Sequence, residues 1–354
     1  MDDRVVFGRI GAEDVHSVQI ANGRGMRASI ITYGARLTEL FVPDRDGVVE
    51  DVVLGFDTLQ EYLATDHYFG ATCGRYGNRI GNGQFMLGGS PVQLDRNEGE
   101  NHLHGGMAGF DRKIWTIAGV TANAATFTAI SEDGEMGFPG RCTLKVVYAL
   151  SEANALTITM SAETERTTVM NMVHHSYFNL AGQGTCNILG HNLHLNSGFY
   201  TPVDAGLLAT GEVLSVAGTA FDFRTAKPIG RDIALLPSVG EGIFEQGGGY
   251  DHNWCLGDAG ANLRHCLTAH DPASGRTMTL HTTEPGVQIY TGGYLTDKVR
   301  AKRGRMMCQF AGFTLETQKF PGSPNHGHFP DCLLHPGEIY EHRMHFAFGT
   351  DTAP

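Results

Sequence analysis

Hydrophobic and polar residues alternate in short runs along most of the chain, which is the period of a half-buried β-strand. Turn-forming residues such as Asn22-Gly23 separate the runs. Only one helix is predicted, at residues 58–64, where Thr58 and Glu61 have the spacing of a capping box. The predicted strands are 15–22, 26–33, 37–42, 114–120, 125–131, 144–150, 155–162, 168–178, 287–290, 306–310, 312–317 and 341–348.

Many short strands, little helix, no internal repeat and no linker predict an all-β protein. We expect one large antiparallel β-sandwich that forms a single domain over residues 1–354. The 47 glycines among 354 residues exceed the average share of this residue and indicate many tight turns.

The formal net charge of −12 argues against a nucleic-acid backbone or an anionic membrane surface as partner. No run approaches 18 apolar residues, so no membrane span is expected. Seven scattered cysteines without a Cys-x-x-Cys motif are typical of reduced thiols in a cytoplasmic protein. The N-terminus lacks a basic segment followed by an apolar run, so we expect no signal peptide. Nothing in the sequence indicates the oligomeric state.

Glu316 is the first candidate for chemistry, because it projects from the predicted strand 312–317, a stiff support for a carboxylate. The loop that follows contains Pro321, Pro324 and Pro330 together with several glycines. A long loop that is this constrained is more typical of a binding site than of a spacer. An ordinary exposed strand carboxylate remains the alternative.

Residues 171–180, NMVHHSYFNL, contain two adjacent histidines. In a regular strand His175 shares its face with Asn171 and Tyr177, which can form hydrogen bonds, and His174 lies on the opposite face. Only one of the two histidines can therefore face a given pocket.

Two further motifs carry cationic and imidazole groups. In GRYGNRIGNGQF, Arg75 and Arg79 lie among glycines, and a guanidinium in such a pocket suits the recognition of several oxygens; a structural ion pair is the alternative. His102-x-His104 and His326-x-His328 each offer half of a metal site, but neither has acidic or cysteine partners at ligand spacing. We therefore expect no metal.

Six motifs taken together resemble the aldose 1-epimerase family, also called galactose mutarotase. They are GRYGNRI, NHLHGG, NMVHHSYFNL, GGYDHNW, PGVQIYTGGYL and GFTLETQKFPGSPNHGHFP, in the family's order from about Gly74 to Glu338. One departure is His174, which stands where the family usually has Asn. The resemblance implies the galactose mutarotase-like supersandwich and a reaction that interconverts the α and β anomers of a free monosaccharide such as galactose or glucose.

Mutarotation needs a base that takes the anomeric proton and an acid that protonates the ring oxygen. The resemblance implies Glu316 as the base and His175 as the acid, with no cofactor or metal. It also implies that Arg79, His104 and Asp251 hold sugar hydroxyls. The further contacts that it implies are Asn78, Tyr177 and Gln288.

Other functions remain open at this stage. Glu316 and Asp251 have the chemistry of a glycoside hydrolase pair. A non-catalytic carbohydrate-binding module is the second alternative, although only Trp115 and Trp254 are present for stacking on a sugar. An Asx turn after Gly247-Gly248-Gly249 is the structural alternative for Asp251. The preferred sugar does not follow from the sequence.

Overall fold

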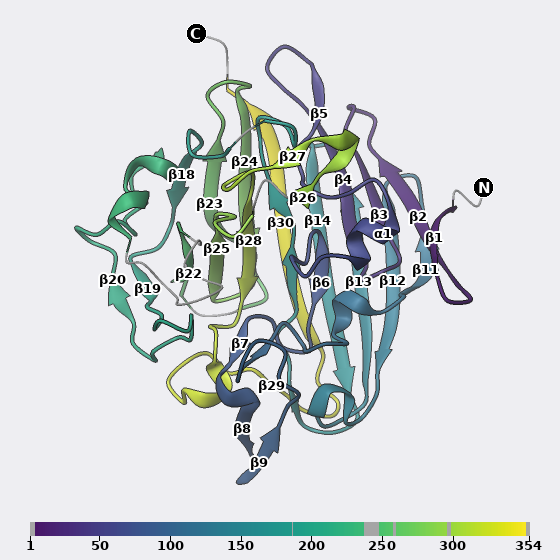
Figure 1. Cartoon of the computed structure of the whole chain (residues 1–354), viewed down its shortest axis with the longest axis vertical. Coiled ribbons are helices and arrows are strands. Elements are labelled where there is room, and N and C mark those ends of the chain that lie inside the picture. Colours follow the sequence, from purple (N-terminus) through teal and green to yellow (C-terminus); the bar gives the residue numbers. More distant parts are fainter. Residues whose placement is uncertain (1–3, 186, 237–247, 258–259, 296–298, 352–354) are drawn as a thin grey trace.

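The computed structural model describes residues 4–185, 187–236, 248–257, 260–295 and 299–351. Antiparallel sheets dominate the described chain, as predicted (Figure 1). The largest sheet has nine strands in the order β11-β12-β13-β14-β30-β24-β23-β18-β21. Their bounds are β11 Thr116–Val120, β12 Ala124–Ser131, β13 Cys142–Leu150, β14 Ala155–Thr164, β18 Asn192–Leu195, β21 Lys227–Pro228, β23 Arg264–His270, β24 Arg276–Thr282 and β30 Tyr340–Thr350.

Two smaller sheets complete the main architecture. A six-stranded sheet has the order β17-β28-β25-β22-β19-β20, and a five-stranded sheet runs β1-β2-β3-β4-β5. The bounds in the first are β17 Tyr177–Phe178, β19 Phe199–Thr201, β20 Leu214–Ser215, β22 Asp251–Cys255, β25 Gly286–Tyr290 and β28 Phe313–Gln318. Those in the second are β1 Val5–Ile10, β2 Glu13–Ala21, β3 Arg27–Ile31, β4 Arg36–Pro43 and β5 Val49–Asp51.

Short two-stranded ladders and single helical turns connect the sheets. The ladders are β6 Ala71–Cys73 with β16 Val173–His175, β7 Arg79–Ile80 with β10 His102–Leu103, β8 Gln84–Leu87 with β9 Ser90–Gln93, β15 Thr168–Val169 with β29 Leu333–Leu334, and β26 Val299–Arg300 with β27 Met306–Met307. The 3₁₀ turns are Gly81–Gly83, Phe110–Arg112, Glu135–Gly137, Ile229–Arg231, Ile233–Leu235, Lys302–Gly304 and Ser323–Asn325.

The main hydrophobic core draws its residues from the nine-stranded, six-stranded and five-stranded sheets. Phe313 and Leu315 of β28 belong to the same buried cluster as Phe346 of β30. The ring of Phe178 lies 5.1 Å from that of Phe346, so the six-stranded and nine-stranded sheets are in direct contact. Because successive residues of a strand point to opposite faces, Thr314 and Glu316 point away from this core.

The predicted helix is confirmed at α1, Leu59–Leu63, including its capping box. The Thr58 hydroxyl accepts a hydrogen bond from the Glu61 N–H, and the Glu61 carboxylate accepts one from the Thr58 N–H. None of the described helices is long and apolar enough to cross a membrane.

Two predicted strands are wrong in extent. The segment 168–178 is divided into β15, β16 and β17, because Asn171 leaves the ladder to bond the Gly77 carbonyl and the Lys319 N–H. The segment 306–310 is extended only at β27, because Phe310 adopts a φ of 64° as the chain turns toward β28. The strands β1, β18, β22, β23 and β24, among others, were not predicted.

Candidate active site

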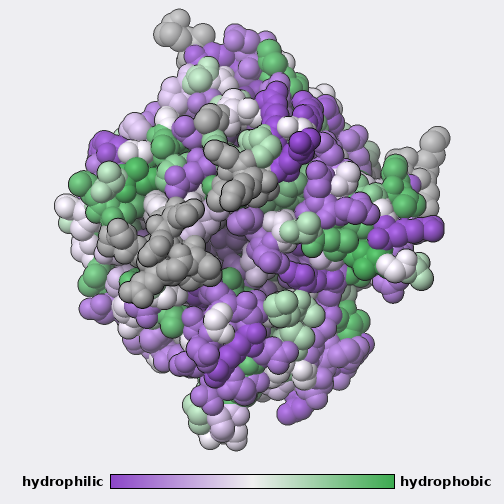
Figure 2. All heavy atoms as spheres, in the orientation of Figure 1, coloured by the Kyte–Doolittle hydropathy of each residue, from purple (hydrophilic) through white to green (hydrophobic). Residues whose placement is uncertain are grey.

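A polar pocket of about 370 Å³ opens on one face of the six-stranded sheet. Figure 2 shows a hollow near the middle of this side of the molecule, surrounded largely by hydrophilic residues. The size lies within the range of small-molecule sites. The residues that line it are Asp66, His67, Tyr68, Asn78, Arg79, Glu98, Leu103, His104, His175, Tyr177, Asp251, Tyr290, Tyr294 and Glu316.

Strand register explains how the sheet supplies one wall of this pocket. Tyr177, Thr314, Tyr290 and Asp251 lie opposite one another on β17, β28, β25 and β22. Residues that are directly opposite in an antiparallel sheet point to the same face. Glu316 lies two residues beyond Thr314 and therefore shares that face.

Glu316 is buried with 2% of its surface exposed, so the interpretation as an exposed strand carboxylate is wrong. The Thr314 hydroxyl donates a 2.9 Å hydrogen bond to Oε1. The other oxygen, Oε2, is buried and has no hydrogen-bond partner among the described residues. Burial away from water raises the pKa of Glu316 to about 8, and the nearby Asp251 carboxylate contributes to this rise.

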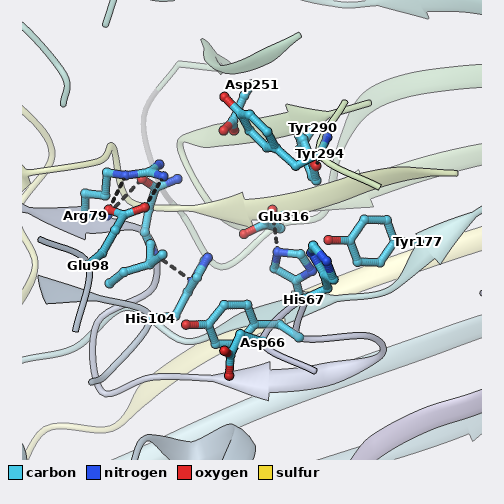
Figure 3. Close-up of a pocket in the computed structure, with 14 residues that line it drawn as sticks. Asp66, His67, Arg79, Glu98, His104, Tyr177, Asp251, Tyr290, Tyr294 and Glu316 are labelled. Carbon is cyan, nitrogen blue, oxygen red and sulfur yellow. Dashed lines mark hydrogen bonds and ion pairs between the residues drawn. The ribbon is translucent and has the colours of Figure 1, made fainter. Parts of the chain in front are cut away.

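His175 faces Glu316, with Nε2 3.5 Å from Oε1. Figure 3 shows Glu316 in the pocket, with His104 and Asp251 on different sides of it. The ring of His175 is surrounded by those of Tyr68, His104 and Tyr177, at centroid distances of 5.6, 5.2 and 5.1 Å. Burial disfavours the imidazolium and lowers the pKa of His175 to about 3. Burial therefore favours the neutral form of both groups, with the proton of the pair on Glu316.

His174 points to the opposite side, as the alternation predicts. Its Nε2 lies 2.7 Å from the Ser176 hydroxyl, and its ring packs against Tyr148 in the core. Both ring nitrogens have hydroxyl neighbours, because the Tyr148 hydroxyl lies 3.4 Å from Nδ1. His174 is a satisfied core residue and does not line the pocket.

Arg75 and Arg79 have different surroundings, although they are only four positions apart in the sequence. Arg75 is buried away from the pocket, where its guanidinium donates to the carbonyl groups of Pro139 and Gly140 at 2.7 Å. Arg79 lines the pocket, and its Nε and Nη2 form a two-pronged contact with Glu98 at 2.7 and 2.6 Å. This fork fixes the plane of the Arg79 guanidinium and leaves Nη1 for a ligand.

His104 reaches the pocket from a tight loop after β10. Gly105 follows with a φ of 95°, and a side chain there would meet the Gly74 carbonyl oxygen at 1.7 Å. The backbone N–H of Asn78 donates to Nδ1 of His104 at 3.1 Å. Since Nδ1 is an acceptor, the proton of the neutral ring lies on Nε2, which is thereby a hydrogen-bond donor.

Asp251 lines the pocket from the first position of β22, where it is part of a strand rather than an Asx turn. The side-chain amide of Gln288 donates to its Oδ1 at 2.6 Å. Gln288 is 2% exposed and does not line the pocket, so its role is to hold the Asp251 carboxylate in position. Asn78 and Tyr177 do line the pocket.

Within the described chain, His104, His175 and Glu316 form the single group of three metal-ligand side chains whose ligand atoms lie within 4.8 Å of one another. The His102-x-His104 pair does not form half of a site, because His102 is turned to the Asp95 carbonyl at 2.6 Å. His328 is bound to the Gly211 carbonyl at 2.7 Å.

Several pocket residues were not singled out from the sequence. Tyr290 and Tyr294 lie inside the motif PGVQIYTGGYL, so that motif contained a signal for them, whereas Glu98 lies three residues before the motif NHLHGG. Asp66, His67 and Tyr68 follow α1 in a loop whose sequence carries no such signal. Their place in the site depends on how that loop packs against the sheet.

Sequence comparisons relate the whole chain to one group of enzymes. Residues 16–347 match the model of the family described as aldose 1-epimerase. The galactose mutarotases of Bos taurus and Homo sapiens are 42% and 41% identical over 347 and 348 residues, with 98% of both chains covered in each case. An aldose 1-epimerase of Escherichia coli (strain K12) is 33% identical over 334 residues, which cover 93% of this chain and 94% of that one.

Solved structures agree with this relationship. A crystal structure of an aldose epimerase homologue from C. elegans superimposes with a TM-score of 0.85 at 26% identity, covering 95% of this chain and 99% of that one. A crystal structure of galactose 1-epimerase from Lactobacillus acidophilus gives a TM-score of 0.83 at 28% identity, with 98% of each chain covered. The supersandwich expected from the sequence is therefore confirmed.

Proposed function

This chain belongs to the aldose 1-epimerase family, and we propose that it interconverts the α and β anomers of free aldoses in the pocket around Glu316 and His175. The protein is an enzyme of the isomerase class. The observation that carries the assignment of the site is the pairing of a buried carboxylate with a buried imidazole at 3.5 Å in a polar cavity.

In the proposed reaction Glu316 is the base and His175 is the acid. The carboxylate takes the proton of the anomeric hydroxyl, the bond between C1 and the ring oxygen breaks, and C1 becomes the carbonyl carbon of an open-chain aldehyde. His175 gives its proton to the former ring oxygen. Rotation about the C1–C2 bond and the reverse proton transfers close the ring with the opposite anomeric configuration.

One proton is sufficient for the whole cycle. Before opening it is on His175, and after opening it is on Glu316, so the pair never needs to exchange a proton with solvent. The raised pKa of Glu316 and the lowered pKa of His175 both have burial as their main cause. Both shifts favour the neutral pair, which is the state of the site when the sugar is open.

Arg79, His104 and Asp251 are proposed to hold the sugar hydroxyls. A carboxylate accepts from hydroxyl groups, whereas the Arg79 guanidinium and the Nε2–H of His104 donate to them. Asn78 and Tyr177 are proposed as further contacts. For Gln288 the hydrogen bond to Asp251 supports a positioning role in sugar binding.

The test of the activity is polarimetry with freshly dissolved α-D-glucose and α-D-galactose. We expect the protein to accelerate the decay of optical rotation without changing its endpoint. Decay at the buffer rate for several aldoses would overturn the proposal. Cleavage of aryl glycosides would instead favour the hydrolase alternative, and binding without acceleration would favour a carbohydrate-binding module.

We also propose that the chain acts as one domain in the cytoplasm. The main core cluster draws buried residues from Val18 to Phe348, which supports a single folding unit. Six cysteines are free in the described part of the chain, which supports a reducing compartment; the seventh, Cys186, lies outside it.

A further inference from the structure

Three histidines lie side by side on the outer face of the nine-stranded sheet, away from the sugar pocket. His265 of β23 is directly opposite His281 of β24, and His281 is directly opposite His345 of β30. The ring centroids are 5.5 Å apart in the first pair and 6.1 Å apart in the second. Figure 1 shows these three strands as neighbours. We call His265, His281 and His345 the histidine row.

The backbone places all three side chains on the same face. In β24 and β30 the neighbours Leu280 and Phe346 point into the core, so His281 and His345 point outward. In β23 the register shifts between His265 and Leu267, and both Cys266 and Leu267 are buried. This bulge adds one residue to the buried side of the strand. His265 and Thr268 therefore both point to the outer face, although three positions separate them.

Threonine hydroxyls orient the two outer rings. Nε2 of His265 lies 3.1 Å from the Thr268 hydroxyl, and Nδ1 of His345 lies 2.9 Å from the Thr157 hydroxyl. These contacts leave Nδ1 of His265 and Nε2 of His345 for a ligand. On the middle ring, Nδ1 of His281 is shielded from solvent and has no hydrogen-bond partner among the described residues. Hydroxyl partners of this kind set the tautomer of metal-binding histidines.

All three residues of the row are partly exposed, so an ion can approach them from solvent. A neutral imidazole is the form that binds metals. Rotation is required, because the ligand nitrogens of the row do not lie within 4.8 Å of one another as they stand.

We propose that His265, His281 and His345 bind one divalent transition-metal ion, with water completing the coordination. An all-imidazole donor set selects Zn²⁺, Ni²⁺ or Cu²⁺ over Mg²⁺ and Ca²⁺, which prefer oxygen ligands. The site is separate from His104, His175 and Glu316 and does not take part in mutarotation. An ion there links three adjacent strands and stabilises the folded chain by mass action.

His194 provides a matched control. It lies on β18 next to His265, with ring centroids 6.0 Å apart and planes inclined by only 27°. His194 is opposite Thr268, and β23 separates it from His281 on β24, so it lies outside the three adjacent positions of the row. His194→Gln removes an imidazole from the same face and leaves the three ligands in place.

The test is calorimetric titration of the full chain, without an affinity tag, with Zn²⁺ or Ni²⁺ in a non-chelating buffer. We expect one ion per chain and no binding of Mg²⁺. His281→Gln is expected to weaken binding by about tenfold or more, in line with the loss of one ligand. His194→Gln is expected to change the affinity by less than about twofold.

A second arm separates this site from the sugar pocket. If His104→Gln removes the bound ion and His281→Gln does not, the ion occupies the pocket and the proposal is overturned. Unchanged affinity in both His281→Gln and His265→Gln also overturns it. Polarimetry without added metal checks folding, because His281→Gln and His194→Gln are expected to retain mutarotase activity. If His281→Gln fails to fold, His345→Gln replaces it in the comparison.

Discussion

Glu316 and Glu284 are two buried carboxylates next to the same pair of strands, but their surroundings are opposite. Glu316 lies within β28 and is 2% exposed, whereas Glu284 precedes β25 and is 1% exposed. Oε2 of Glu284 lies 2.8 Å from Nζ of Lys319, the residue after β28. Oε2 of Glu316 has no partner in the described structure, and its other oxygen faces the imidazole of His175 instead of a lysine.

The difference indicates which carboxylate is structural and which is reactive. A buried carboxylate with a cation beside it, as Glu284 has in Lys319, has its charge compensated. A buried carboxylate without a cation is poised to hold or release a proton near neutral pH, which a general base requires. Burial alone does not distinguish the two; the partner does.

The largest expected effect is that of Glu316→Gln on turnover. Glutamine keeps the size and the hydrogen-bonding capacity but cannot take a proton, so kcat should fall by roughly 10²- to 10⁴-fold while KM changes little. Polarimetry at several sugar concentrations measures both. Asp251→Asn is the control with the opposite pattern, mainly a raised KM. Near-normal turnover in the Gln variant would rule out Glu316 as the base.

The two adjacent histidines test the other half of the pair. His175→Asn should lower kcat by roughly 10²- to 10⁴-fold, because it removes the group that faces Glu316. His174→Asn should have a mild effect on kcat, since His174 contacts Ser176 and Tyr148 in the core. The same polarimetric assay compares them. A larger loss from His174→Asn would contradict the assignment.

On the structural side, Lys319→Met should destabilise the fold by about 3 kcal/mol, because it leaves the Glu284 carboxylate buried without its cation. Chemical denaturation measures the change, and kcat should remain close to that of the parent protein. Adding Glu284→Gln to Lys319→Met should recover most of the loss, since no unpaired charge then remains. Failure of this recovery would show that packing, rather than charge, dominates at this pair.

The smallest expected effect is a gain in stability from Glu316→Gln. Burial raises the pKa of Glu316 from its ordinary value of 4.5 to about 8. Between these values the folded chain keeps a proton that the unfolded chain has released, so the parent protein loses stability relative to the Gln variant as the pH rises. The expected advantage of Gln is on the order of 2 kcal/mol at pH 6, about 1.5 units above the ordinary pKa, since one pKa unit corresponds to about 1.4 kcal/mol.

Denaturation at pH 5 and at pH 6 measures this effect. The advantage of the Gln variant should be small at pH 5, where the carboxyl in the unfolded chain is still partly protonated. An advantage that is equal at both pH values would show that the titration of Glu316 is not its cause. A parent protein that is the more stable of the two at pH 6 would show that other groups in the folded protein compensate the Glu316 carboxylate.

The sequence by itself determined the features that depend on local period and spacing. Alternation predicted most strands of the nine-stranded sheet, and it predicted that His174 and His175 point in opposite directions. The capping box predicted α1. The order of six motifs indicated the family, which the comparisons confirm. These features are readable because side-chain direction in a strand, and the first turn of a helix, depend on residues close together in the chain.

Only the tertiary structure decided which of these residues meet. It separated Arg75, held by carbonyl groups, from Arg79, held by Glu98, although both lie in one glycine-rich motif. It also interrupted the segment 168–178 at Asn171, whose partners lie elsewhere in the chain. Burial and pairing are set by segments that are distant in sequence, so the contrast between Glu316 and Glu284 has no signature in the residues around either one.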